Sequence, residues 1–252
     1  METVKRSEIR NRLLLLILIL ALPAACNSNT SESKASSNVL TKIEGSQLTY
    51  TLPAPKTDGG MSVEKALSDR RSRRNFKDRA ISAQQLSQLL WAAYGVTLPR
   101  LNVSSLRGGL RTTPSAGATF PLEIYAIIGN VEGIEPGVYR YISDENKIVR
   151  VVKGDVRSAL RKAALGQRMI SEAPLSVFYS AVFERTTAAY GQRGIKYVYM
   201  EIGHSAQNVY LQAEALGLGT CAIGAFTDDR VRQILNLPKN EVPLYLMPIG
   251  YY

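Results

Sequence analysis

The sequence contains few of the residues that bind soft metals, and its apolar runs are short. It has one histidine and two cysteines in 252 residues. Structural and catalytic zinc sites normally take three or four ligands from cysteine, histidine and carboxylates, and we therefore predict no metal site. The apolar run at residues 13–22 is too short to span a bilayer comfortably, so it does not indicate a transmembrane helix.

Residues 1–26 have the pattern of an export signal. Lys5, Arg6, Arg10 and Arg12 precede the apolar run, as the basic region precedes the apolar region in secretory signal peptides. We expect these residues to lie outside the folded part of the chain. They predict a protein that is exported from the cytoplasm.

The end of this signal resembles the lipobox of bacterial lipoproteins, in which small residues precede a cysteine that is acylated and becomes the new N-terminus. The residues are Leu22, Pro23, Ala24, Ala25 and Cys26. Lipoboxes usually carry leucine where this chain has Pro23, so cleavage by an ordinary signal peptidase is the alternative. Lipidation of Cys26 would anchor the protein on the periplasmic or cell-surface side of a bacterial membrane.

The chain is basic, with 31 Lys and Arg against 21 Asp and Glu. A positive balance can indicate nucleic acid, an anionic membrane surface or an anionic ligand as the partner. The charge is scattered, and outside the N-terminus it clusters only at Arg70, Arg71, Arg73 and Arg74. This distribution indicates a local phosphate site and argues against nucleic-acid binding.

Residues 27–60 are rich in Ser, Thr, Asn, Lys and Pro and have few large apolar side chains. Such a composition buries too little surface to order a chain, and we predict a flexible tether. The alternative for residues 48–52 is an extended arm that lies against the domain. The folded domain is then expected at residues 61–252.

The rest of the chain alternates helical and strand-like patterns. Ser82 and Gln85 form a predicted capping box for a core helix that Gly95 ends in a left-handed conformation. Apolar residues at steps of three and four predict a long, central and largely buried helix at residues 195–216. Further helices are expected at residues 63–69, 155–164 and 228–235, and strands at residues 122–128, 138–142, 147–152, 175–182, 221–226 and 244–250. The hairpin and the irregular order of elements predict an α+β fold.

Arg70, Arg71, Ser72 and Arg74 are the first candidates for a binding site. Several guanidinium groups and a hydroxyl at the end of a short helix suit a dianionic phosphate. Taken alone, such a run is more often a solvated or membrane-facing patch. The phosphate hypothesis therefore needs support from other segments.

Three other segments follow this cluster in order. They are Pro-Ser-Ala-Gly-Ala-x-Phe-Pro-Leu-Glu-x-Tyr at residues 114–125, Glu-x-Gly-His-x-Ala-Gln-Asn at residues 201–208 running into Ala-Leu-Gly-Leu-Gly, and Ile-Gly-Ala-Phe at residues 223–226. Together with Arg-Arg-Ser-x-Arg-x-Phe at residues 70–76, they resemble the nitroreductase superfamily, in particular its SagB-type branch of thiazole (azoline) oxidase-like dehydrogenases. The resemblance spans about residues 61–250. It implies a nitroreductase-like fold, with a central, mostly antiparallel sheet flanked by helices, and FMN as the cofactor.

The resemblance assigns parts of the cofactor to particular residues. Arg70 and Ser72 match residues that hold the FMN phosphate, and Arg74 matches a basic residue at the pyrimidine edge, where a cation raises the reduction potential. Small residues at 115–117 let the backbone approach the isoalloxazine closely, and residues 201–203 match a stretch near its reactive face. The predicted cofactor-binding residues are Arg70, Arg71, Ser72, Arg74, Ser115, Ala116, Gly117, Glu201 and Gly203.

Three side chains are candidates for proton transfer. His204 is the only imidazole, and an imidazole titrates near neutral pH; the alternative is a structural role on a packed helix. Lys196 and Tyr197 resemble a Lys-Tyr pair that removes protons in some azoline dehydrogenases, and a desolvated lysine can lose its proton near neutrality. The alternative for this pair is a surface lysine beside a core tyrosine.

We therefore expect an exported FMN-dependent oxidoreductase that passes a hydride through flavin N5 between a small-molecule donor and acceptor. The resemblance implies a homodimer with FMN at the subunit interface, where the turn near Ser72 and the loop near Gly117 contact the same flavin. The main rival hypothesis is a non-catalytic, flavin-binding lipoprotein of the envelope. A binder of anions or nucleic acid that uses the arginines is the third.

Overall fold

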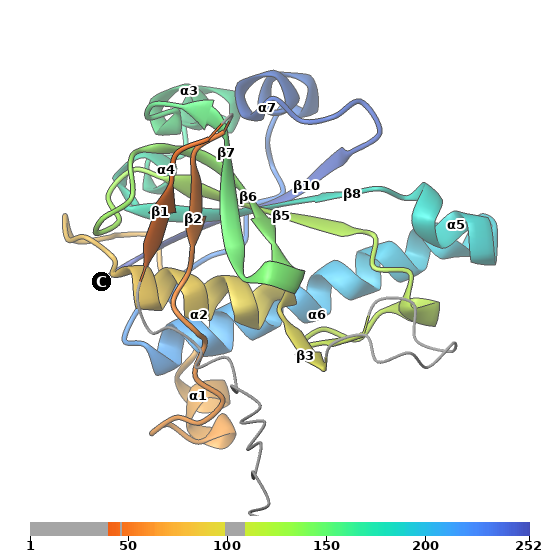
Figure 1. Ribbon diagram of the computed structural model, residues 1–252, viewed down its shortest axis with the longest axis horizontal. Coiled ribbons are helices and arrows are strands. Elements are labelled where there is room, and N and C mark those ends of the chain that lie inside the picture. The colour runs from red at the N-terminus through yellow and green to blue at the C-terminus, as the bar shows by residue number, and fades with distance from the viewer. Residues whose placement is uncertain (1–39, 46, 99–108) are drawn as a thin grey trace, which may run out of the picture. The chain divides into compact units, whose positions relative to one another are not determined.

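An eight-stranded antiparallel sheet forms the centre of the computed structural model (Figure 1). The structure describes residues 40–45, 47–98 and 109–252. The strand order across the sheet is β1-β2-β7-β6-β5-β8-β10-β9. These strands are β1 (Thr41–Ile43), β2 (Thr49–Thr51), β5 (Leu122–Ile128), β6 (Gly137–Ile142), β7 (Lys147–Lys153), β8 (Leu175–Ala181), β9 (Gly219–Thr220) and β10 (Val242–Gly250). A separate two-stranded sheet pairs β3 (Val96–Leu98) with β4 (Leu110–Arg111).

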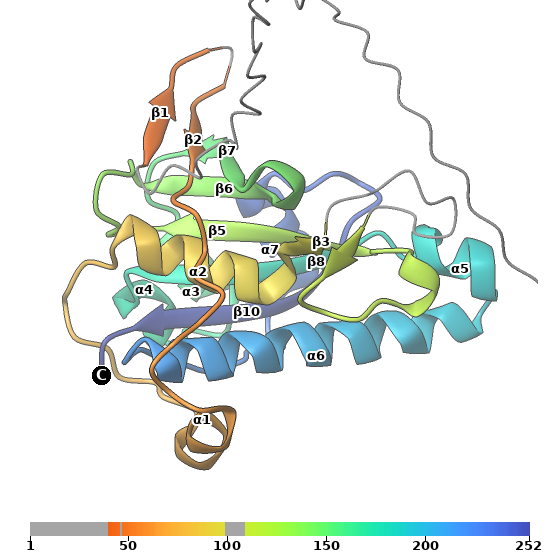
Figure 2. The same ribbon diagram turned by 60° about the horizontal axis from the view of Figure 1, so that its bottom comes forward.

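Helices cover both faces of the large sheet (Figure 2). One face carries α2 (Ala83–Tyr94) and α6 (Arg193–Ala215), and the other carries α3 (Arg157–Ala163), α4 (Met169–Glu172) and α7 (Asp228–Leu235). Strand β5 supplies both cores, because successive side chains such as Ile124 and Tyr125 point to opposite faces. The helix α1 (Val63–Asp69) contacts α6, and α5 (Glu184–Tyr190) leads into it. This arrangement confirms the predicted α+β fold class.

Local sequence signals position several of these elements. The capping box of α2 is present, since Ser82 Oγ accepts from Gln85 N and the Gln85 side chain accepts from Ser82 N. The expected hairpin of β6 and β7 turns at residues 143–146, where Asn146 adopts the left-handed conformation. Both features confirm the sequence prediction.

Gly95 does not end α2 in the predicted left-handed conformation. The chain continues directly into β3, and Gly95 has φ −68° and ψ 153°. A Cβ at this position would lie 2.2 Å from the Trp91 side chain. The need for glycine is therefore steric, and the predicted conformation is wrong.

The strand predicted at residues 221–226 is also wrong, because only β9 and a bridge between Ile223 and Leu246 pair with β10 here. The register on both sides of the gap places Cys221 opposite Pro248. Proline has no N–H to donate to the ladder. The pairing is therefore interrupted where the chain passes Pro248.

Strand β2 makes the N-terminal arm part of the sheet. It pairs with β7, and Leu48, Tyr50 and Leu52 are buried in the core beneath α2 and α6. The alternating burial matches the side-chain period of a strand. The alternative of an extended arm at residues 48–52 is confirmed.

The segment after β2 docks along α2. The Ser87 hydroxyl donates to Pro53 O, and the Gln88 side chain accepts from Lys56 N and donates to Lys56 O. These bonds satisfy the backbone of an extended segment that has no strand partner. The tether prediction is therefore wrong for residues 48–56, and the folded part begins before residue 61.

Helix α6 is buried on one face only. Val198, Ile202 and Val209 belong to the core, whereas Tyr199 and Met200 are each 54% exposed. The long helix predicted at residues 195–216 is confirmed, and it keeps one exposed strip in the single chain. Such an apolar strip on a long helix is a surface that a partner can cover.

The predicted signal peptide at residues 1–26, the lipidation site Cys26 and the tether up to residue 39 lie outside the described residues. In the part of the chain that the structure covers, no helix has the length and apolar character needed to cross a membrane. Export and lipid anchoring therefore stay predictions.

Replacing Tyr50 tests whether the arm belongs to the cooperative core. Tyr50 is 1% exposed, and its ring packs edge-on against Tyr139 with centroids 5.9 Å apart. Tyr50→Ala is expected to lower the free energy of unfolding in urea by about 3–5 kcal/mol, because it leaves a large cavity. Ile43→Ala, at a 51% exposed position of β1, is the control and should change it by less than about 0.5 kcal/mol. Equal small effects of both variants would contradict the burial of the arm.

Candidate functional site

Most of the predicted site residues fall into two groups along α6 (Figure 2), and Glu201, Gly203 and His204 lie on the helix between them. Residues 70–74, the arginine turn, follow α1 and contact the C-terminal part of α6. Residues 115–117, the glycine loop, contact α5 at the N-terminal end of α6. Each group is described in turn.

Tyr210 on α6 holds the arginine turn. Its hydroxyl lies 3.2 Å from Ser72 Oγ and accepts a hydrogen bond from Ala222 N at 2.8 Å. The guanidinium of Arg70 lies over the Tyr210 ring, 5.2 Å from the ring centroid, within the range of cation–π attraction. One side chain thus joins the turn to the segment after β9.

The turn also extends the sheet beyond β9. Ser72 forms a parallel bridge with Thr220, and Arg73 N donates to Thr220 O at 2.9 Å. This approach requires glycine at position 219, where a Cβ would lie 2.6 Å from the Arg73 side chain. The Arg73 guanidinium lies 4.2 Å from the centroid of the Tyr252 ring. Arg73 therefore packs against the last residue of the chain.

The positive charge of the turn has no carboxylate beside it. Across residues 40–45, 47–98 and 109–252, no ion pair includes Arg70, Arg71, Arg73 or Arg74. Arg71 donates to Ser68 O and to Arg70 O, so it closes the C-terminal end of α1 and is not directed to a ligand. The other exposed charges are therefore free to attract an anion.

Arg74 lies near the segment that follows β9. Burial raises the pKa of the Cys221 thiol, and the Arg74 charge opposes that rise. Beyond Cys221, Gly224 is exposed, and a Cβ there would approach Tyr245 only to 3.5 Å. The arginine turn therefore lies near the segment after β9, and Gly224 in that segment leaves room for another molecule to approach the backbone.

The glycine loop has a strained backbone. Gly117 has φ 58°, and Ala118 and Phe120 also have positive φ, at 50° and 46°. This region costs a residue with a Cβ roughly 1–2 kcal/mol. The loop is held by the hydrogen bond from Phe120 N to Ser115 Oγ and by the bond from the Thr119 hydroxyl to Ala116 O. Strain that the surroundings hold in place is typical of functional sites.

The Lys196–Tyr197 pair lies at the same end as the glycine loop. A Cβ on Gly117 would lie 2.5 Å from the Tyr190 hydroxyl, and the Tyr190 ring packs edge-on against Tyr197 at 5.1 Å. Lys196 is exposed and Tyr197 is half-buried. The single chain therefore has the arrangement of the alternative, a surface lysine beside a partly buried tyrosine.

The Glu201 side chain is buried and is exposed neither at the arginine turn nor at the glycine loop. It is 2% exposed, and its Oε1 accepts from the Tyr94 hydroxyl at 2.5 Å, while Oε2 has no partner among the residues that the structure describes. Burial raises the pKa of the Glu201 carboxyl, and the hydroxyls of Tyr94 and Ser115 oppose this rise. Glu201 thus lies behind the glycine loop in the single chain, and its contact with a cofactor stays a prediction.

Gly203 and His204 lie at the middle of α6 on its exposed face. A Cβ on Gly203 would meet no atom within 4 Å. His204 is therefore not the structural histidine of a packed helix in the single chain. Neither residue adjoins the arginine turn or the glycine loop.

The arginine turn and the glycine loop lie along different parts of α6. The turn contacts Tyr210, whereas Ser115 lies beside Glu201, about 14 Å of helix rise away. Contact of both segments with one flavin at the interface of a homodimer stays a prediction.

The arginine turn fits a phosphate-bearing cofactor, because Arg70 and Arg74 have no carboxylate partner in the described ranges and the Ser72 hydroxyl is held by Tyr210. Where coordinates are described, no group of three or more His, Cys, Asp or Glu could hold a metal ion. The hydrogen-bond donors of the arginine turn therefore suit an anion.

The sequence model of the Nitroreductase family matches residues 67–251. The chain belongs to the nitroreductase family. A protein named as a nitroreductase, MJ1384 of Methanocaldococcus jannaschii, is 47% identical over 190 residues, which cover 75% of this chain and 91% of that protein. The microcin B17-processing protein McbC of Escherichia coli is 28% identical over 183 residues, which cover 70% of this chain and 65% of McbC.

A solved structure of a protein named as a nitroreductase of Ralstonia eutropha has a TM-score of 0.67 and 27% identity, covering 84% of this chain and 94% of that one. The comparisons confirm the predicted resemblance and the nitroreductase-like fold. The chain is therefore an oxidoreductase of the nitroreductase family.

The sequence analysis did not predict how two tyrosines hold the arginine turn and the glycine loop. Tyr210 joins the arginine turn to Ala222, and Tyr190 covers Gly117. No motif marks either residue, and the helical period predicts only a core position for Tyr210. Their role appears only when distant segments meet.

The buried Glu201 predicts a pH-dependent stability. Its folded-state pKa is raised, so its contribution is complete below the unfolded value of about 4.3 and is lost as the pH rises through the folded pKa. The free energy of unfolding of the native protein should therefore fall relative to Glu201→Gln between pH 5 and pH 8, by at most about 1.4 kcal/mol per pH unit. Urea titrations across this range measure the difference.

Tyr94→Phe is the companion variant. It removes a donor that stabilises the carboxylate, so the fall should continue to higher pH in Tyr94→Phe and disappear in the double variant with Glu201→Gln. Parallel stability curves for the native protein and Glu201→Gln would show that this carboxyl is not perturbed.

Proposed function

We propose that this nitroreductase-family protein binds FMN and passes a hydride through flavin N5 to or from a small organic substrate. The observation that carries the proposal is the arginine turn, in which half-buried Arg70 and exposed Arg74 form no described ion pair and stand on either side of Ser72 in the sequence. A family member with such an anion site has the charge that a phosphorylated flavin requires.

Arg70 and Ser72 would hold the phosphate, and Arg74 would lie at the pyrimidine edge of the ring. The cofactor supplies a two-electron acceptor that returns to its oxidised state when it reduces a second substrate. Tyr210 keeps Ser72 in position and also binds Ala222 N. The ligand would therefore meet donors that are already ordered, which lowers the entropic cost of binding.

The site is completed by a second copy of the chain. The exposed strip of α6 with Tyr199, Met200 and Gly203 is the surface that the second copy would cover. Antiparallel helices would then build two equal sites, each from one arginine turn and one glycine loop. Lys196 and Tyr197 would enter the site with the glycine loop, which makes them better placed for proton transfer than His204.

Residues 1–26 would export this enzyme, and lipidation at Cys26 would anchor it to a bacterial membrane. The basic and apolar order of the first residues supports export. The small-molecule electron donor and acceptor would then be those of the envelope.

FMN titration of the purified full-length protein tests the cofactor. The native protein should turn yellow, lose colour with an electron donor such as NADH, NADPH or dithionite, and regain it in air. Arg70→Gln is expected to weaken FMN binding roughly ten- to hundredfold, since it removes a charged hydrogen bond to phosphate. Riboflavin, which has no phosphate, should bind both proteins equally.

Arg230→Gln, which removes an exposed arginine of α7, is the control for net charge and should bind FMN as the native protein does. A protein that stays yellow but transfers no electrons would favour the non-catalytic lipoprotein. Indifference to FMN, combined with salt-dependent binding of polyanions, would favour the third hypothesis.

Mixing two damaged chains tests whether each site is shared. Arg70→Gln damages the turn, and Gly117→Val damages the loop, because valine disfavours the positive φ and would collide with Tyr190. In a random mixture of exchanged dimers, half are mixed, and each mixed dimer has one intact site. FMN-dependent activity should rise from near zero in either variant to about a quarter of the native value. No gain after verified exchange would mean that each site lies within one chain.

A further inference from the structure

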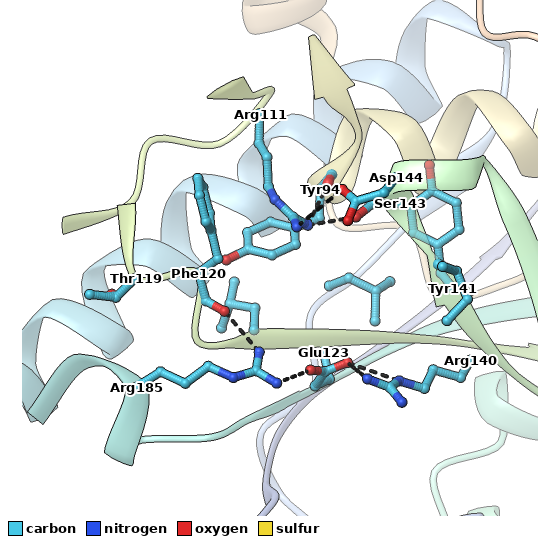
Figure 3. Close-up of a pocket in the computed structure, with 13 residues that line it drawn as sticks. Tyr94, Arg111, Thr119, Phe120, Glu123, Arg140, Tyr141, Ser143, Asp144 and Arg185 are labelled. Atoms are coloured by element: carbon cyan, nitrogen blue, oxygen red, sulfur yellow. Dashed lines mark hydrogen bonds and ion pairs between the residues drawn. The ribbon is translucent and has the colours of Figure 1, made fainter. Parts of the chain in front are cut away.

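A second cavity lies beside the glycine loop and is lined by residues that the proposed flavin site does not use. Its volume is about 340 Å³. Figure 3 shows Arg185, Glu123 and Arg140 along one side and Arg111 with Ser143 and Asp144 on the other. We call it the Arg111 cavity. Neither the arginine turn nor residues 115–117 line it.

Glu123 pairs with both arginines on one side of the Arg111 cavity, and this group keeps one net positive charge. Its side chain is 9% exposed, and its two oxygens lie 2.6 Å from Arg185 and 2.8 Å from Arg140. Arg185 also donates to Phe120 O. This carboxylate therefore has both of its oxygens engaged by guanidinium groups, and it fixes that wall.

Arg111 on the other side is held rigidly. Its guanidinium lies 4.6 Å from the ring centroid of Tyr94 and 4.7 Å from that of Phe120, and it donates to Ser143 Oγ at 2.7 Å. Its side chain is 14% exposed. The Arg111 side chain is therefore already ordered without a ligand, which lowers the entropic cost of binding one.

Within the cavity, the Arg111 charge is only weakly compensated. The carboxylate on its wall, Asp144, lies 3.7 Å away and is 70% exposed, so water screens it. Glu201 lies behind Tyr94 and does not line the cavity, and the Arg111 charge opposes the rise in its pKa that burial causes. Within the described coordinates, Arg111 Nε has no hydrogen-bond partner. A largely buried guanidinium without a close anion lowers the stability of the fold, and a bound anion would offset this loss.

The space next to Arg111 is apolar. Leu122 and Ile124, which are 3% and 2% exposed, line it together with the rings of Phe120 and Tyr141. Such a surface favours a ligand with an apolar body. A guanidinium favours a carboxylate as its partner. Arg111 Nη1 already donates to Ser143 Oγ and Tyr94 O and Nε is buried, so Nη2 is the nitrogen left for a ligand.

We propose that the Arg111 cavity binds a small organic carboxylate, with its carboxylate at Arg111 and its apolar body against Leu122, Ile124 and Phe120. This site is independent of the proposed flavin site. The apolar wall argues against inorganic phosphate, which would gain nothing from it. The ligand would also contact Phe120, whose N–H is bonded to Ser115 of the glycine loop.

Calorimetric titration of the full-length protein with benzoate tests this site, and benzamide is the neutral probe of the same shape. Benzoate should bind once per chain and raise the midpoint of thermal unfolding. Arg111→Gln should weaken benzoate binding roughly ten- to hundredfold. Arg230→Gln, the exposed control, should leave it unchanged.

Asp144→Asn is the second variant, chosen because a 70% exposed side chain is not needed for folding. It removes the carboxylate that competes for Arg111, so benzoate should bind about two- to fivefold more tightly. The opposite directions expected for Arg111→Gln and Asp144→Asn separate a charge effect from damage to the fold.

Three results would overturn the proposal: equal binding of benzoate and benzamide, unchanged benzoate binding in folded Arg111→Gln, or inorganic phosphate competing as strongly as benzoate does. Arg70→Gln distinguishes this site from the flavin site. Benzoate binding that persists in Arg70→Gln, with or without FMN, supports the separate cavity. Loss of benzoate binding in that variant would place benzoate in the flavin site and contradict the assignment.

Discussion

The packing of α6 against the sheet is the constraint on which the site depends. Val198, Ile202 and Val209 fix one face of the helix in the core, and the opposite face is left exposed. The helix then holds the arginine turn at Tyr210 and supports the glycine loop at Glu201. It therefore sets the separation of the two groups and leaves an exposed face between them.

The two arginine-rich regions of the chain differ in how their charge is compensated. Around Glu123, two guanidinium groups bind one nearly buried carboxylate, and the result is a fixed wall. In the arginine turn the guanidinium groups contact aromatic rings and backbone carbonyls instead. Stacked arginines remain charged and ordered at the same time, which is the state that anion recognition requires.

The glycine loop stores backbone strain that the surrounding contacts hold in place. Ala118 and Phe120 keep positive φ values because Ser115, Thr119 and Tyr190 enclose the turn. Glu201 lies beneath Ser115 in the core, so α6 also supports this loop from behind. A structural change at Glu201 or in the glycine loop would therefore alter the other one through direct contact.

The sequence by itself determined the family, the positions of strands such as β5 and β8, the helix α7, and the composition of the arginine turn. These features are local, since they follow from residue period, capping and short motifs. Only the tertiary structure decided that Tyr50 is buried, that Glu201 faces Tyr94, that Tyr210 joins Ser72 to Ala222, and that Arg111 lines a cavity. Each of these depends on which distant residues meet, and the period of a single segment carries no information about its partners.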